Sequence, residues 1–328
     1  MMTNMDKMVR ELLDDAEAQR MFLQVEDGSI ADVLNRRVRR GRLFSPHQGV
    51  FARYSYWEKL NPVQRHLHLV ETLARIHPEW IFCGPTAALL HGLYVSYLDL
   101  DHVHVLGGCT RTVGVVRTLN RQDRTSTKTA SGHMATPLLT AAFETMRTMP
   151  FRRALGIADS TLRVLARPAE KIAIDLGRKF RGRQGITHVS GVLEHANPLS
   201  ENGGESFARA VMIEEGIQLP NLQVAYTLPH FGSKYRVDFD WGIYRHGRFV
   251  HVVGELDGYA KLHDPEITCG MKPPEVLRLE RNRESRLTAL GIEVARFTFD
   301  DCVKVEPLLH TLRGFGIPQA NGHLPGSG

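Results

Sequence analysis

The chain has 328 residues, 42% hydrophobic and 23% charged, a mixture typical of a globular protein with two or three domains. Lysine and arginine exceed aspartate and glutamate by 41 − 36 = 5, and the isoelectric point near 9.1 allows a polyanionic partner without requiring one. No stretch reaches about eighteen apolar residues and the N-terminus has no apolar core, so the sequence predicts neither a membrane span nor a signal peptide. Four scattered cysteines without a C-x-x-C pair indicate a reduced, cytoplasmic protein.

The N-terminal segment, residues 1–60, is predicted to form a small winged-helix-like module. Residues 5–23 carry apolar side chains at helical spacing, and residues 29–40 form a second helical pattern that ends at Gly41. Two short apolar runs on either side of a Pro-His-Gln-Gly turn then predict a hairpin. Helix, turn, basic helix and hairpin is the order of a winged helix-turn-helix.

The second of these helices carries a run of arginines on its polar side. The run consists of Arg36, Arg37, Arg39, Arg40 and, just after the helix, Arg42. Arginines in front of a wing-like hairpin are suited to bind DNA phosphates, which position a duplex without reading its sequence. A charged run is equally typical of an ordinary solvated helix face, so both interpretations are retained.

The middle segment, residues 61–198, is predicted to be a mixed α/β region, and it shows no chemical motif. Helical patterns and strand patterns alternate along it. The helices are expected at 62–76, 86–91, 138–146, 151–164 and 169–180, and the strands at 103–106 and 113–119. His66 and His68 lie two residues apart on the first helix, so they do not share a face, and we interpret them as surface residues.

The last predicted domain, residues 199–305, follows a boundary that is rich in Asn, Pro and Gly. A helix, three strands, a helix and a final strand are expected, which is the pattern of a mixed α/β sandwich. Their ranges are 205–215, 222–228, 235–241, 249–256, 275–290 and 292–297. The tail, residues 306–328, is expected to be mostly disordered, since it becomes rich in glycine and proline from Gly316 onward.

Carboxylates cluster on two of the predicted strands. Alternation puts Asp238 and Asp240 on one face of their strand, and Glu255 and Asp257 on one face of the next. A turn joins the two strands, so they are expected to pair and to place Asp238 beside Glu255. Adjacent carboxylates repel unless a cation bridges them, and hard oxygen ligands favour Mg²⁺ or Mn²⁺. Such a metal activates water and stabilises the charge on a phosphate under attack.

Two more residues are candidates for the same site. Glu205, on the preceding helix, is expected to complete the acidic ring, and Lys261, just beyond Asp257, to supply a cation for the attacking water or the phosphate. The plainer interpretation is a solvated strand face followed by a strand end that runs into a turn. The two acidic strands together, with Glu205 upstream, favour a site over that interpretation.

These residues resemble, in their order, the Vsr-like branch of the PD-(D/E)XK nuclease superfamily over roughly residues 200–302. The matching segments are Glu205-Ser206, Val237-Asp238-Phe239, Glu255-x-Asp257-Gly258-x-x-Lys261 and the stretch from Leu290 to Phe297. The resemblance implies a restriction-endonuclease-like mixed sheet flanked by helices, with Asp238 and Glu255 as metal ligands. In that superfamily a lysine follows the glutamate after one residue. Asp257 stands in that position here, which leaves the activating role to Lys261.

The N-terminal two-thirds of the chain is similar to actinobacterial AbiEi-type antitoxin or regulator proteins. The matching segments are Gly41-Arg42-Leu43, Gly49-Val50-Phe51, Ala87 to Leu93, Thr136-Pro137-Leu138 and Ala158-Asp159. The first functional hypothesis is a metal-dependent DNA endonuclease in defence or repair. The second is a non-cleaving transcriptional regulator or AbiEi-like antitoxin with a degenerate nuclease fold and a cognate toxin as partner. The third is an interaction scaffold in such a pair.

Overall fold

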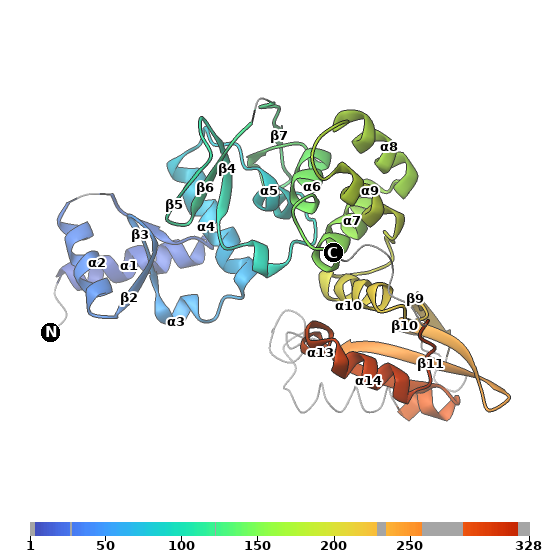
Figure 1. The fold of residues 1–328 in the computed structure, drawn as a ribbon. Coiled ribbons are helices and arrows are strands. Elements are labelled where there is room, and N and C mark those ends of the chain that lie inside the picture. Colours follow the sequence, from blue (N-terminus) through green and yellow to red (C-terminus); the bar gives the residue numbers. More distant parts are fainter. Residues whose placement is uncertain (1–3, 27, 122, 228–233, 258–284, 321–328) are drawn as a thin grey trace. The chain divides into compact units, whose positions relative to one another are not determined.

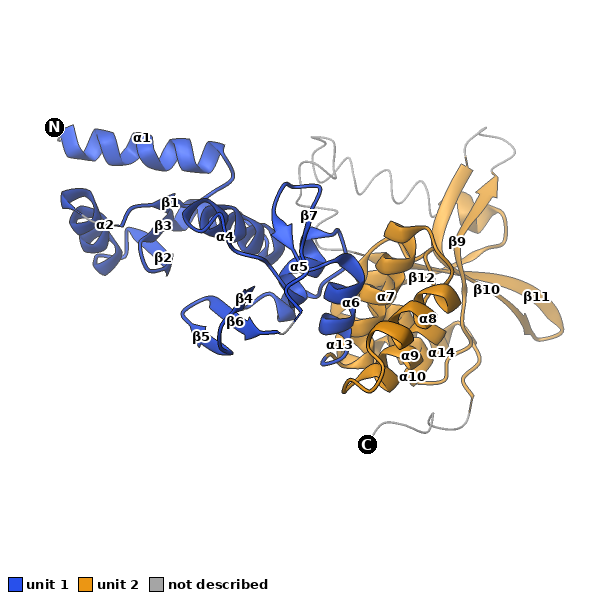
Figure 2. Cartoon of the chain, turned by 90° about the horizontal axis from the view of Figure 1, so that it is seen from above, with its two compact units in different colours: residues 1–148 blue, residues 149–328 orange. Residues whose placement is uncertain are grey.

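The computed structural model describes residues 4–26, 28–121, 123–227, 234–257 and 285–320. The chain divides into two compact units, residues 1–148 and 149–328, which are blue and orange in Figure 2. Helices alternate with small sheets throughout (Figure 1), so the mixed α/β class predicted from the sequence is confirmed. Within the described ranges, no helix is long and apolar enough to cross a membrane.

The first unit begins with two helices packed on a three-stranded antiparallel sheet. These elements are α1 (Asn4–Ala18), β1 (Leu23–Gln24), α2 (Ser29–Arg39), β2 (Leu43–His47) and β3 (Val50–Arg53), with strand order β1-β3-β2. Val9, Leu13, Leu34 and Phe51 are buried where the helices meet the sheet. The predicted hairpin is present as β2 and β3, and Gly49 in its turn has a φ of 72°, which glycine adopts without strain.

The rest of the first unit mixes helices with short strands. The elements are α3 (Tyr54–Trp57), α4 (Pro62–Ile76), α5 (Gly84–Leu90), the short 3-10 helix Tyr97–Asp99, β4 (Val103–Gly107), β5 (Arg111–Val113), β6 (Val116–Asn120), β7 (Thr127–Lys128), β8 (Met134–Ala135) and α6 (Leu138–Met146). The bounds of α4 agree with the sequence pattern, because Asn61 and Gln64 form a capping box and Pro62 fits the first turn.

The interpretation of His66 and His68 as surface residues is wrong. Their exposed fractions are 3% and 7%. His66 lies 3.1 Å from both the Leu100 carbonyl and the Thr86 hydroxyl, whereas His68 lies 2.9 Å from the Tyr56 hydroxyl. Both faces of α4 are therefore covered, which the helical spacing of its apolar residues alone does not reveal.

The second unit opens with four helices. They are α7 (Phe151–Leu165), α8 (Ala169–Lys179), α9 (Ile186–Glu194) and α10 (Gly203–Glu214). Two of them, α7 and α8, were predicted as part of the middle region, whereas α9 falls within that range but was not predicted. A fully buried ion pair joins α7 to α10, with Arg209 Nη2 2.7 Å from Asp159 Oδ1. Arg209 also donates to the His195 carbonyl, and this second bond helps to offset the desolvation of the pair.

A four-stranded mixed sheet forms the other half of the second unit. Its strands are β9 (Asn221–Thr227), β10 (Lys234–Arg245), β11 (Arg248–Asp257) and β12 (Glu293–Thr298), in the order β12-β11-β10-β9. The three consecutive strands are antiparallel, and β12 runs parallel to β11. Figure 1 shows β10 and β11 as a long orange hairpin. The predicted helix 275–290 lies mostly outside the described residues.

Two hydrophobic clusters lie on the two faces of this sheet. The large cluster joins Phe239, Trp241, Val252 and Phe297 to α10 and the C-terminal helices. The small cluster consists of Val237, Val253, Leu287 and Ile292, with Val224, Tyr226 and Val294 against it. Adjacent residues such as Val252 and Val253 belong to different clusters, as the alternation of a strand requires.

The prediction of a mostly disordered tail is wrong for its first half. After α13 (Phe299–Lys304) the chain forms α14 (Glu306–Gly314). Leu308, Leu309 and Leu312 are buried in the large cluster, and Ile317 joins them beyond the helix. The described chain therefore stays packed on the sheet well past residue 305.

Candidate functional site

Helix α10 brings Glu205 to the end of strand β11. The helix starts at Gly203 because the Asn202 side chain accepts from the Glu205 backbone N–H at 3.0 Å. Gly204 lies against the Leu256 side chain, and a Cβ added there would stand 2.9 Å from Leu256 Cδ2. The absence of a side chain at this position permits the close approach of helix and strand.

The Glu205 carboxylate is buried, with an exposed fraction of 4%, and accepts three hydrogen bonds. The donors are the Glu201 backbone N–H at 2.7 Å, Asn202 Nδ2 at 2.5 Å and Gln223 Nε2 at 3.0 Å. Burial is the main cause that raises the pKa of Glu205 to about 7. The negative charge of Asp238 adds to this rise, whereas the hydrogen bonds from the Glu201 backbone and Gln223 oppose it. Glu205 and Asp238 are therefore electrostatic neighbours.

The alternation of strands β9 and β10 reverses at Gln223. This residue has a φ of 56°, which is uncommon for a non-glycine residue. Leu222 packs with Phe239 in the large cluster, whereas Val224 packs with Val237 in the small cluster on the other face. Residues two apart on a regular strand share a face of the sheet. The side chains of both strands therefore change face between the pair of Leu222 with Phe239 and the pair of Val224 with Val237.

Asp238 occupies the point in β10 where this reversal happens. Its half-buried carboxylate accepts from the Leu256 backbone N–H, with 3.1 Å between Oδ2 and the nitrogen. The ladder of β10 and β11 ends at the pair of Phe239 and Gly254, the residues next to Asp238 and Glu255. Asp238 thus lies beside the peptide bond that joins Glu255 to Leu256.

Arg296 reaches the same place from strand β12. The parallel ladder pairs Glu255 with Arg296 and Asp257 with Thr298. The guanidinium lies 3.6 Å from Glu255 Oε2 and 3.2 Å from Asp257 Oδ1. Arg296 does not figure among the residues predicted for the site, since nothing in the sequence shows which strand pairs with β11.

Asp240 belongs to a separate polar cluster. Its side chain is 3% exposed, accepts a hydrogen bond from the Tyr226 hydroxyl, and lies 3.0 Å from His251 Nδ1. Burial, together with the bond to Asp240, raises the pKa of Tyr226 above its usual range. Although alternation predicts Asp238 and Asp240 on one face, the two carboxylates make different contacts.

The described acids do not fit a resident divalent metal in this arrangement. Their hard oxygen atoms are the ligands that Mg²⁺ and Mn²⁺ prefer. Arg296 nevertheless holds Glu255 and Asp257, and the Leu256 amide holds Asp238. Among the residues that the structure describes, no three His, Cys, Asp or Glu side chains are grouped to hold a metal. Lys261 lies outside the described residues.

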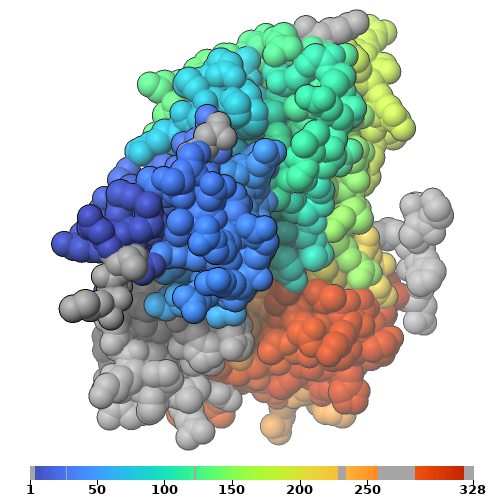
Figure 3. Space-filling model, turned by 90° about the vertical axis from the view of Figure 1, so that its left-hand side faces the viewer, coloured from blue at the N-terminus to red at the C-terminus, as the bar shows by residue number. Residues whose placement is uncertain are grey.

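The arginines of α2 divide into two kinds. Arg37 is only 20% exposed and forms an ion pair with Asp6 of α1. The others, Arg36, Arg39, Arg40 and Arg42, are exposed, and their side chains form no ion pair with any described residue. The residues of α1 and α2 form part of the surface turned toward the viewer in Figure 3. Four of the five predicted DNA contacts are thus accessible.

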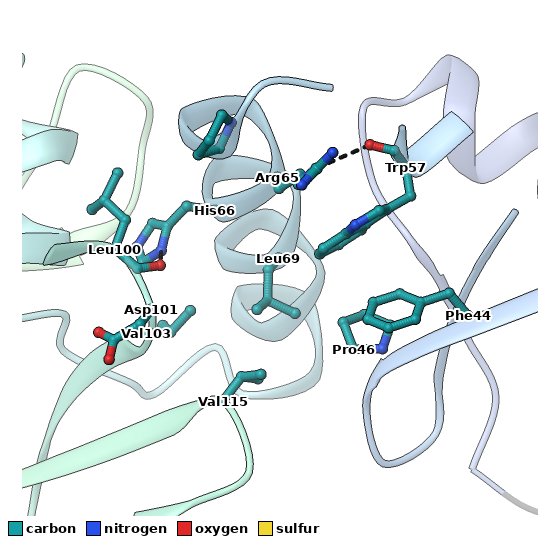
Figure 4. A pocket seen from close by; sticks show the side chains of 11 residues that line it. Phe44, Pro46, Trp57, Arg65, His66, Leu69, Leu100, Asp101, Val103 and Val115 are labelled. Carbon is teal, nitrogen blue, oxygen red and sulfur yellow. Dashed lines mark hydrogen bonds between the residues drawn. The ribbon is translucent and has the colours of Figure 1, made fainter. Parts of the chain in front are cut away.

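A cavity of about 270 Å³ lies within the first unit, between β2, α4 and β4 (Figure 4). Arg65 lies over the Trp57 ring at 4.9 Å and donates to the Trp57 carbonyl, while His66 bonds Leu100 and Thr86. Arg65 and His66 already form hydrogen bonds within the protein, so a molecule in the cavity would meet mainly apolar side chains. Its apolar lining includes Phe44, Pro46, Leu69, Leu100, Val103 and Val115.

Comparison with known proteins gives relatives but no activity. No family model matches the chain, and no solved structure matches it. The chain is 31% identical over 231 residues to uncharacterized proteins MT2308 and Rv2248 of two Mycobacterium tuberculosis strains. The match covers 69% of this chain and 77% of each relative. The chain therefore belongs to the same family as these two mycobacterial proteins.

Proposed function

We propose that the protein acts on DNA through a nuclease-type site in its second unit. The observation that carries this proposal is that Asp238, Glu255 and Asp257 lie near one another on β10 and β11, with Arg296 of β12 against two of them. Asp238 accepts a hydrogen bond from the Leu256 N–H, next to Glu255, and Glu255 shares Arg296 with Asp257. The negative charge of Asp238 also contributes to the raised pKa of Glu205. Convergent carboxylates from separate elements are typical of sites for phosphodiester chemistry.

The order of the elements supports a restriction-endonuclease-like domain. A helix with Glu205, an antiparallel hairpin with Asp238 and Glu255, and a parallel strand at 293–298 follow the order that the resemblance to the Vsr-like branch implies. In this proposal Mg²⁺ or Mn²⁺ would be the cofactor, and Asp238 and Glu255 are the residues that the resemblance implies would hold it. The arrangement described supplies no complete ligand set, so no catalytic step is derived through the metal.

The first unit is proposed to bind the duplex. Its first 60 residues combine two helices with a three-stranded sheet, which is compatible with a winged helix-turn-helix. Four exposed arginines on and after α2 have no acidic partner among the described residues, and this supports contacts to phosphates over a merely solvated face.

A second candidate function is a non-cleaving DNA-binding regulator or AbiEi-like antitoxin. The ion pairs of Arg296 favour it, because they neutralise Glu255 and Asp257 without any metal. The aspartate at position 257, where the superfamily has lysine, favours it as well. A cognate toxin is the partner that this alternative proposes.

Cleavage of DNA by the full-length protein separates the two candidates. We expect supercoiled plasmid or single-stranded DNA to be cut in Mn²⁺ and left intact in EDTA. Asp238→Asn should abolish the cleavage, because Asp238 is one of the two residues proposed as metal ligands. Asp240→Asn is the matched control and should retain it, since Asp240 contacts Tyr226 and His251 instead.

The opposite result would be equally informative. Intact DNA over a broad panel of substrates, together with unchanged DNA binding by Asp238→Asn, would leave only the regulator. Loss of cleavage in both variants would place the chemistry elsewhere or indicate misfolding, which circular dichroism of the two variants tells apart.

A further inference from the structure

The cavity of the first unit joins the hairpin of β2 and β3 to the residues around α4. Its volume is about 270 Å³, and its walls come from several elements. Phe44 and Pro46 belong to β2, Leu69 to α4, Val103 to β4 and Val115 to the turn before β6. Figure 4 shows Phe44, Pro46, Leu69 and Val115 around a common space. A molecule bound there would therefore contact segments that are distant in the sequence and would stabilise their packing.

The size and the lining of the cavity favour an aromatic ring as the occupant. An apolar cavity of about 150 Å³ already accommodates benzene, so this one has room for a ring with a short side chain. The rings of Phe44 and Trp57 lie in the lining, with 4.7 Å between their centroids and 46° between their planes. Aromatic rings attract a further ring through face and edge contacts. Ordered water is a poorer occupant, because it needs several polar partners that these side chains do not offer.

Two polar residues of the lining already have other partners. The ring nitrogens of His66 lie 3.1 Å from the Leu100 carbonyl and the Thr86 hydroxyl, and burial lowers the pKa of His66 to about 4. His66 is therefore neutral at physiological pH. The side chain of Asp101 is 68% exposed, and its carboxylate lies 2.9 Å from His102 Nδ1. Neither residue therefore supplies a free charge to the interior of the cavity.

Arg65 provides a charge that is still available. Its guanidinium lies over the Trp57 ring, 4.9 Å from the centroid, and its Nε donates to the Trp57 carbonyl at 3.0 Å (Figure 4). Its two amino groups form no hydrogen bond or ion pair with any residue that the structure describes. A planar guanidinium binds a carboxylate through two parallel hydrogen bonds, and stacking on an indole ring fixes its orientation. An anion is therefore the group that this side of the cavity can recognise.

We propose that the cavity binds a small aromatic carboxylate. The ring lies among Phe44, Leu69 and Val115, and the carboxylate accepts hydrogen bonds from the amino groups of Arg65. A monoanion fits better than a phosphate dianion, because the described lining has one arginine and also includes the carboxylate of Asp101, which repels additional negative charge. The site goes beyond the proposed action on DNA, and it needs neither DNA nor a metal ion.

The test uses the full-length protein and titration calorimetry with defined probes. Phenylacetate and indole-3-acetate carry a carboxylate on one ring and on two fused rings, respectively. Their amides have the same shape without the charge, and acetate has the charge without the ring. We expect at least one of the two aromatic acids to bind with 1:1 stoichiometry and a Kd below about 1 mM, as ligands of this size can. The matching amide and acetate should bind at least about tenfold more weakly.

Substitutions in the lining locate the binding. Arg65→Gln removes the cation and should weaken binding of the acid to the level of its amide. Arg75→Gln is the matched control, because Arg75 lies on the same helix but outside the lining, and it should bind the acid like the wild type. Val115→Phe fills the cavity and should abolish binding of both acid and amide. Val113→Phe, at an exposed position of β5, should leave both unchanged.

The proposal is overturned if neither acid shows saturable binding, if the amide binds as tightly as its acid, or if Val115→Phe binds like the wild type. Should Arg65→Gln fail to fold by circular dichroism, Val115→Phe and the comparison of acid with amide on the wild type decide instead. No DNA enters these titrations. A protein that neither cuts nor binds DNA would therefore refute the proposed function without changing the result for this cavity.

Discussion

At the scale of single residues, burial shifts the pKa of several titratable side chains. It lowers the pKa of His66 and of His104 to about 4 and raises the pKa of Glu205 to about 7. Hydrogen bonds act against each shift, among them the bond between His66 and the Leu100 carbonyl. Desolvation outweighs them, so both histidines stay neutral in the folded chain at physiological pH.

Because His66 and His104 are buried in their neutral form, we expect the first unit to lose stability in acid. Between pH 6.5 and pH 4 the unfolded chain binds protons that the folded chain does not, so the free energy of unfolding falls as the pH drops through this window. Above pH 6.5 this contribution is constant. Each histidine accounts for up to about 3 kcal/mol, since one pKa unit corresponds to roughly 1.4 kcal/mol.

Urea unfolding at several pH values measures this effect. The fluorescence of Trp57 and Trp80 reports on the first unit in a Trp241→Phe background. His66→Asn should flatten the dependence on pH between 4 and 6.5, whereas His77→Gln, at a more exposed histidine, should not. An unchanged pH dependence in His66→Asn would show that His66 is not buried in its neutral form.

Some contacts of the candidate site could be predicted from the sequence and others could not. The short turn correctly predicts that the strands of Asp238 and Glu255 are neighbours, whereas the face of each side chain is predicted from alternation. Alternation does not reveal the reversal at Gln223, which depends on a local backbone conformation and separates the contacts of Asp238 from those of Asp240. Arg296 was equally hidden, since its place depends on the pairing of strands distant in sequence.

At the scale of elements, the close packing of α10 on β11 positions the acid of the helix. Gly204→Ala would place a Cβ 2.9 Å from Leu256 Cδ2 and 3.1 Å from Asn202 Oδ1. We expect the variant to lose roughly 1–3 kcal/mol of stability, as overpacked sites do. The start of α10 should also shift, and any activity that depends on Glu205 should fall with it.

Gly177→Ala in α8 is the control for Gly204→Ala. No atom lies within 4 Å of a Cβ added at Gly177, so alanine should stabilise that helix by about 0.5–1 kcal/mol. Chemical denaturation of the two variants should therefore give free-energy changes of opposite sign. Equal changes would mean that the contact between Gly204 and Leu256 is not tight.

Most helices and strands could be predicted because the patterns that define them lie within a few neighbouring residues. The capping box at Asn61 and the apolar period after it define α4, and the turn at Gly49 defines the hairpin of β2 and β3. Helix α14 was missed although Leu308, Leu309 and Leu312 follow helical spacing, because the glycine and proline content of the final residues dominated the composition of the tail. The parallel pairing of β12 is a tertiary property that no local pattern contains.

At the scale of the whole molecule, the candidate DNA contacts and the candidate catalytic acids fall into different units. The exposed arginines of α2 belong to the first unit, and the candidate acids belong to the second. If the protein binds DNA as proposed, we expect the contact to lie chiefly in the first unit, because clustered cations bind phosphates and clustered carboxylates repel them. The two contributions are therefore separable by mutation.

The last prediction concerns the first unit as the main contact surface for DNA. Replacing Arg36, Arg39, Arg40 and Arg42 together by glutamine should weaken duplex binding and lower the salt slope by up to about 3–4, since each phosphate contact contributes close to 0.9. Arg37→Gln should instead lower stability, because it breaks the ion pair with Asp6. The matched control replaces the basic side chains of 178, 179, 181 and 183, an exposed run in the second unit, by glutamine. It removes the same charge, so an equal loss of affinity in both variants would mean that DNA binding follows net charge and not the surface of α2.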